Sequence, residues 1–199
     1  MVGIMSMSQR LRELIAEFAE VQANPITDGA LVDRMSTEAT RWVNAVHMQC
    51  RRVSEPLVDA NNPGEEIWRQ EIDLHFLLVA LTRLRRAVGI TTRVDQLQAT
   101  LVNRIIEFDD RVPYLSRLRN VAEHFDDYTV GRGRDTRVMR FELQRWSMDR
   151  DPDGHLIWIW LGERLQIAEA HSAAKLLYQG FITDIERYVA DLAQRSLDE

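Results

Sequence analysis

The chain of 199 residues has little or nothing of several features that define whole classes of protein. It has one cysteine, Cys50, so a single copy cannot form an internal disulfide, which excludes a disulfide-stapled secreted module. Nine glycines and five prolines are too few for a collagen-like or linker-rich chain. No apolar run reaches the roughly 18 residues that a membrane-spanning helix needs. Residues 1–10 lack the charged start and apolar core of a signal peptide. We therefore expect a cytoplasmic protein with no membrane contact.

The composition that remains is typical of a folded globular protein. Hydrophobic residues make up 45% of the chain and charged residues 28%, which argues against disorder. The length favours one domain over residues 1–199, with no repeat to divide it. The net charge of −6 argues against binding nucleic acid through a general positive field. However, 24 of the 25 basic residues are arginine, whose planar fork suits phosphate groups. The arginines form two local groups, Arg83, Arg85 and Arg86, and then Arg132, Arg134, Arg137 and Arg140.

Most of the chain has the spacing of amphipathic helices, in which apolar residues recur every three or four positions. The predicted helices span about 6–23, 31–54, 63–89, 92–108, 113–129 and 168–194. Residues 74–84 are apolar on nearly every side, so the third helix should lie at the centre of a bundle. Gly89 after the first arginine group predicts the end of that helix. Thr92 with Asp95 predicts a capping box for the next helix.

The period changes before the last helix. Residues 156–161 alternate and are rich in tryptophan and isoleucine, as in a strand. The preceding residues 151–154 read DPDG, a turn sequence. We predict a hairpin that pairs about 139–149 with 155–161, with room for a third short strand after it. The predicted fold class is therefore mainly α, a helical bundle of about five to six helices with a β-hairpin inserted at about 138–167, before the C-terminal helix.

One predicted helix carries a polar motif. Residues 116–124 read SRLRNVAEH, which places Arg119, Asn120 and His124 in order. This helix resembles the motif helix of the HEPN superfamily (higher eukaryote and prokaryote nucleotide-binding domains), whose members are helical bundles, often dimeric. Many of them are endoribonucleases that need no metal, so the resemblance implies that these three residues are catalytic. The toxin branch of the superfamily has a tyrosine two residues after the histidine, where this chain has Asp126.

The chemistry that the resemblance implies needs no cofactor. RNA carries its own nucleophile, the ribose 2′-hydroxyl, and a histidine can accept or return its proton. An arginine can stabilise charge on the phosphoryl oxygens, and an asparagine can orient them. Because one copy supplies one such histidine, we predict a homodimer whose motif helices face one cleft. A toxin or defence effector of this kind would also have a protein partner such as an antitoxin. The residues expected to hold the RNA backbone are Arg117, Arg132, Arg134, Arg137 and Arg140.

The same residues also fit a plainer interpretation. Arg119 and Glu123 have the spacing of an ordinary helical ion pair. Each of the five histidines follows an arginine by five to seven positions, so the bare spacing is not specific. On a helical wheel Arg119 lies about 140° from His124, whereas Arg117 is nearly in line with it. The alternative is therefore a non-catalytic helical bundle that binds a protein or nucleic-acid partner.

Two other groups of residues suggest different sites. His47 with Cys50, and Glu71 with His75, have helical spacing and would suit a metal site between helices. The repeated Glu-x-x-His pattern of di-iron bundles is absent, so we assign no metal ligands. The tryptophans of residues 146–160 could stack on bases, but their place in an apolar alternating run predicts core.

Overall fold

The structure is a computed structural model that describes residues 26–55, 63–138, 142–143 and 145–198. Within these residues it has six helices and one three-stranded sheet, which confirms the predicted fold class. The helices are α2 (Asp28–Ser54), α3 (Pro63–Thr91), α4 (Asp95–Arg111), α5 (Leu115–Glu123), α6 (Phe125–Thr129) and α7 (Ile167–Asp198). The strands are β1 (Trp146–Arg150), β2 (Leu156–Trp160) and β3 (Glu163–Gln166). The helix predicted over 6–23 lies outside the described residues.

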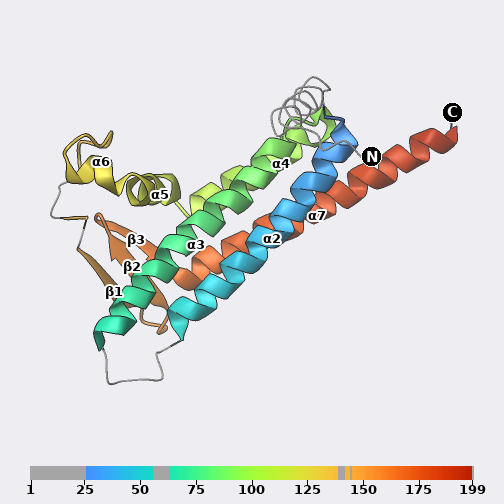
Figure 1. Ribbon diagram of the computed structural model, residues 1–199. Coiled ribbons are helices and arrows are strands. Elements are labelled where there is room, and N and C mark those ends of the chain that lie inside the picture. The colour runs from blue at the N-terminus through green and yellow to red at the C-terminus, as the bar shows by residue number, and fades with distance from the viewer. Residues whose placement is uncertain (1–25, 56–62, 139–141, 144, 199) are drawn as a thin grey trace, which may run out of the picture.

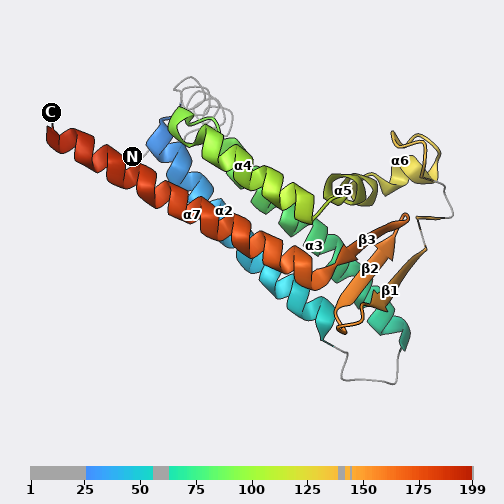
Figure 2. The ribbon, with the colours of Figure 1, turned by 180° about the vertical axis from the view of Figure 1, so that it is seen from behind.

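Four long helices form the bundle, with α3 packed against α2, α4 and α7 (Figures 1 and 2). The central position of α3 confirms the prediction from its apolar sequence. Its inward residues are almost fully buried and consist mainly of leucine, namely Leu74, Leu77, Leu78, Leu81 and Leu84. No described helix combines the length and the hydropathy needed to cross a bilayer.

The junction between α3 and α4 differs from the prediction. The helix α3 continues through Gly89 to Thr91, so the glycine does not end it. Thr92 donates its hydroxyl to the Gly89 carbonyl, and Val94 takes the N-cap position of α4 without a side-chain cap. The capping box was therefore wrong. Arg85 forms a bidentate pair with Asp109 of α4 rather than neutralising a helix end, with nitrogen–oxygen distances of 2.6 and 2.5 Å.

The helix predicted over 113–129 is in fact two helices. His124 separates α5 from α6, with φ −118° and ψ 31°. A continuous helix would have turned its whole apolar stripe inward. The break instead buries Tyr128 and leaves Phe125 61% exposed. Tyr114, at the N-cap of α5, has a left-handed φ of 57° and is also exposed.

The sheet is antiparallel in the order β1-β2-β3. The first connection is the predicted turn, and Arg150 pairs with Leu156 across it. The second is a two-residue turn at Leu161 and Gly162, whose φ values of 55° and 76° are those of a type I′ hairpin turn. The third strand that the sequence suggested is therefore present. The central strand β2 is buried, and its Trp158 and Trp160 rings stack with centroids 5.3 Å apart, so these tryptophans belong to the core.

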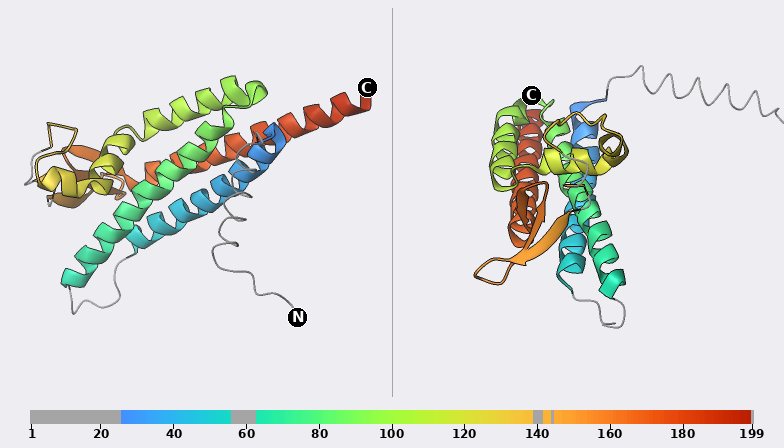
Figure 3. Two further views of the ribbon diagram at one scale, coloured as in Figure 1. Left: turned by 45° about the horizontal axis from the view of Figure 1, so that its top comes forward. Right: turned by 90° about the vertical axis from the view of Figure 1, so that its left-hand side faces the viewer.

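The sheet, α5 and α6 lie together at one end of the bundle (Figures 1 and 3). The helix α7 starts directly after β3 and runs along α2 and α4 to the other end. The helix α5, which carries the motif, therefore lies close to α3 and to the sheet, although these segments are distant in sequence.

Candidate functional site

An open groove of about 660 Å³ lies where α3, α5 and the loop after α6 come together. Every residue that lines it has a polar group in its side chain: Thr82, Ser116, Arg117, Arg119, Asn120, Tyr128, Arg134, Asp135 and Arg137. The lining holds four arginines and one carboxylate, and its other side chains are neutral hydrogen-bonding groups. A groove of this composition favours an anionic ligand.

The loop that forms one wall of the groove is fixed by the way α6 ends. Gly131 has a φ of 77°, and its N–H donates to the Tyr128 carbonyl. The Arg132 N–H donates to the Asp127 carbonyl, which completes a Schellman motif. A residue with a side chain would be strained at Gly131. The glycine therefore turns the chain back so that residues 134–137 reach the groove.

The loop over residues 131–138 packs against the buried side chain of Tyr128. Its side chain is 4% exposed, and its hydroxyl oxygen accepts hydrogen bonds from Asn120 Nδ2 and from the Asp135 N–H, each at 3.2 Å. Gly133 lies against the ring so closely that a Cβ atom there would overlap it. The motif asparagine, the tyrosine and the loop are thus one connected unit.

Arg117 joins the groove to the sheet. Its Nε donates to Asp135 at 2.8 Å, and its Nη1 donates to the Leu161 carbonyl and to Glu163. Hydrogen bonds from Arg137 and Arg117 hold the pKa of Asp135 well below its usual range. Because these carboxylates already engage Arg117, it is mainly a structural crosslink. Arg137 also donates to Asp135, through Nε at 2.9 Å and Nη2 at 3.0 Å. Arg134 is the lining arginine that forms no ion pair within the described part of the chain.

Arg119 lines the groove but is partly engaged. Its Nη2 forms an ion pair with Glu123 one turn further along α5, as the plainer interpretation of the spacing predicted. Its Nε is buried and has no hydrogen-bond partner in the described part of the chain. The hydroxyl of Thr82, on the α3 wall of the same groove, is also buried without a partner there. Both atoms are donors for which the described residues supply no acceptor.

The third motif residue has a different position. His124 is exposed at the junction of α5 and α6, and it is not among the lining residues of the groove. Its backbone N–H donates to the Asn120 carbonyl at 3.1 Å, which keeps it one turn from Asn120. The structure therefore brings Arg119 and Asn120 together and leaves the imidazole beside them, facing outward.

The expected RNA-binding arginines fall into three groups. Arg134 and Arg137 line the groove with Arg117. Arg132 is exposed on the same loop but does not line the groove. Arg140 lies outside the described residues.

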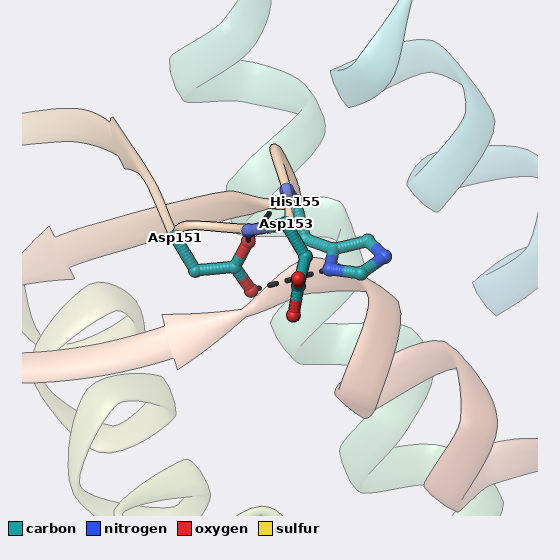
Figure 4. Close-up of side chains that lie close together, drawn as sticks. All are labelled: Asp151, Asp153 and His155. Carbon is teal, nitrogen blue, oxygen red and sulfur yellow. Dashed lines mark hydrogen bonds and ion pairs between the residues drawn. The ribbon is translucent and has the colours of Figure 1, made fainter.

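The hairpin turn holds the one group of three metal-ligating side chains found among the described residues, Asp151, Asp153 and His155 (Figure 4). Asp151 already accepts the N–H groups of Asp153 and His155, the His155 ring nitrogen at 3.2 Å, and the Gln166 amide. These bonds shape the turn and use the acceptor capacity that a metal would need. The cluster is therefore best explained as a turn scaffold.

His47 does not form the metal pair with Cys50 that the sequence suggested. The His47 ring meets His171 of α7, with Nδ1 and Nε2 3.2 Å apart, rather than Cys50. Burial lowers the pKa of His171, and the positive charges of His47 and Lys175 lower it further. Cys50 is buried, with its thiol directed at the Ile167 carbonyl.

Sequence reasoning missed several lining residues for identifiable reasons. Tyr128 has the spacing of a core residue and is indeed buried, but it also lines the groove. Thr82 interrupts an apolar helix, which was a usable signal that this position meets something polar. Asp135 lies in a loop rich in arginine, and no nearby sequence pattern indicated that it would pair with Arg117, 18 residues away.

Comparison with protein-family models, curated proteins and solved structures finds no match to this chain.

Proposed function

We propose that the chain is a metal-independent endoribonuclease of the HEPN type, with the arginine-lined groove as the site that holds the ribose-phosphate backbone. One observation carries the proposal: Arg119 and Asn120, the first two motif residues, line a groove together with three more arginines. Nucleic-acid backbones are bound chiefly by such contacts between arginine and phosphate. The net charge of the chain is negative, so the binding would depend on local contacts with the lining arginines and not on a general positive field.

In this proposal each residue has a defined role. Arg134 and Arg137 bind the phosphates, and Arg119 stabilises charge on the phosphoryl group that reacts. His124 transfers the proton of the ribose 2′-hydroxyl or of the leaving oxygen. Because this imidazole stands beside the groove, a second copy of the chain would supply the other histidine and close the cleft. Specific activity should then fall on dilution, as dimers dissociate.

The second candidate is a protein that binds RNA in the groove without cleaving it. It is favoured by the outward position of His124 and by the ion pair that engages Arg119. The two candidates share the groove and differ only in chemistry, so one set of variants separates them.

The test uses a labelled single-stranded RNA, with binding followed by fluorescence anisotropy and cleavage followed on a gel in EDTA. Arg134→Ala should weaken binding and reduce the salt slope by about 0.7. Arg93→Ala is the control, because this exposed arginine lies on the turn between α3 and α4 and does not line the groove. His124→Ala should leave binding intact and abolish cleavage, whereas His155→Ala should change neither.

The outcomes are distinct. Cleavage that survives His124→Ala removes this histidine from the mechanism. Binding without any cleavage by the wild-type protein favours the second candidate. An absence of RNA binding, or equal losses in Arg134→Ala and Arg93→Ala, refutes the groove as the RNA site.

A further inference from the structure

The hydroxyl of Tyr128 has one hydrogen-bonding capacity left. Its oxygen accepts two N–H groups, from Asn120 and from the Asp135 backbone, which occupy its two lone pairs. No hydrogen bond among the described residues uses its own hydrogen, although Tyr128 is buried. A buried donor of this kind is costly unless something accepts from it. Tyr128 lines the groove, so the acceptor would be a ligand there.

The atoms around the hydroxyl define what that ligand must be. Arg119, which also lines the groove, has a buried Nε that is a second donor without a partner in the described part of the chain. The buried hydroxyl of Thr82, another lining residue, is a third such donor. Arg134 adds a positive charge that no ion pair among the described residues neutralises, whereas Arg137 is paired with Asp135. Donors that converge with positive charge suit a group that only accepts hydrogen bonds and is negatively charged, as a phosphoryl group is.

We propose that Tyr128 is a ligand-binding residue whose hydroxyl donates a hydrogen bond to a non-bridging phosphoryl oxygen of RNA bound in the groove. This inference rests on the proposed function, because it specifies which part of the RNA enters. Asn120 is then a positioning residue. Its amide donates to the phenol oxygen of Tyr128, and this leaves the O–H of Tyr128 to point into the groove. The contact reads the backbone and not the base, so it gives no sequence preference.

The experiment compares two dinucleotides that cannot be cleaved because they carry 2′-fluorine in place of the 2′-hydroxyl. In one, the linkage is a phosphodiester; in the other, a formacetal linkage replaces the PO₂ unit with CH₂. Affinities are measured by NMR titration of the wild-type protein and of Tyr128→Phe. The variant should bind the phosphodiester about tenfold or more weakly, the loss expected for one hydrogen bond to a charged group. Its affinity for the formacetal should be unchanged.

Tyr178→Phe is the matched control, since the Tyr178 hydroxyl bonds to Thr40 Oγ1 at 3.0 Å and lies outside the groove. It should bind both dinucleotides as the wild-type protein does. If Tyr128→Phe does not fold, fluorotyrosine at position 128 replaces it. This residue keeps the hydroxyl and makes it a stronger donor, so the phosphodiester should bind more tightly.

The inference is overturned if Tyr128→Phe lowers the affinity for both dinucleotides equally, or changes neither affinity. It is also overturned if fluorotyrosine at position 128 does not raise the affinity for the phosphodiester. If these results occur while the wild-type protein still binds single-stranded RNA through Arg134, the proposed function stands and only the role of Tyr128 fails. If the wild-type protein binds neither the dinucleotide nor longer RNA, both fail together.

Discussion

The substitution Gly133→Ala tests how the loop over residues 131–138 is held against α6. A Cβ atom at residue 133 would lie closer than 3.0 Å to three carbons of the Tyr128 ring, whereas ordinary contacts are 3.4–4 Å. The ring has little room to retreat, because it is buried and its hydroxyl is held by Asn120 and Asp135. Overpacking costs about 1–3 kcal/mol, and loss of one hydrogen bond adds about 1 kcal/mol. We expect the free energy of unfolding to fall by about 2–4 kcal/mol.

Urea unfolding followed by tryptophan fluorescence measures this change as a shift in midpoint at constant slope. Gly89→Ala is the control, because a Cβ there would meet only Ile105 Cδ1, at 3.8 Å, and the residue lies inside α3. Alanine is more favourable than glycine in a helix by about 0.5–1 kcal/mol, so this variant should be more stable than wild type. The same change in residue type should thus have opposite effects at the two positions. A Gly133→Ala midpoint at or above that of the wild-type protein refutes the packing around Tyr128.

Three further variants or reagents test other parts of the structure. The lowered pKa of His171 means that the folded protein takes up this proton less readily than the unfolded chain, so stability is complete above pH 6.5 and falls as the pH drops through this value. His171→Gln should flatten the resulting decline in melting temperature, and an unchanged slope would assign it to another group. Burial raises the pKa of the Cys50 thiol to about 12, so a thiol reagent at about pH 8 should label the native protein far more slowly than the urea-unfolded chain; equal rates would contradict its burial. Arg117→Met should lower the free energy of unfolding by about 1–3 kcal/mol, because Asp135 and Glu163 each lose an ion-pair partner. Calorimetry measures this loss, and unaltered stability would show that Arg117 is no crosslink.

The bundle was predictable because burial imposes a period on the sequence. Residues 74–84 are apolar on nearly every side, and their leucines form the centre of the bundle. The alternating run before α7 forms the central strand. The break at His124 was not predictable, since no proline or glycine marks it. It is set by tertiary contacts: Tyr128 turns inward to meet Asn120 and the Asp135 backbone, which a continuous helix would not allow.

The site was predictable only where its residues are close in sequence. Arg119 and Asn120 are adjacent, and the structure places both at the groove. Arg117 was expected to hold RNA, yet its partners Asp135 and Glu163 come from 18 and 46 residues away, and no local spacing reveals them. Contacts at such separations depend on how the helices and the sheet pack.

The course of α7 determines how the protein is best attached to a surface. The helix has 32 residues and is therefore about 48 Å long at 1.5 Å per residue. Its last turns are exposed from Asp191 onward and lie at the opposite end of the molecule from α5, α6 and the sheet (Figure 1). A biotin or dye attached there leaves the arginine-lined end facing solution. Immobilisation on a sensor chip through this helix would thus present every molecule in one orientation, with its groove open to the flowing sample.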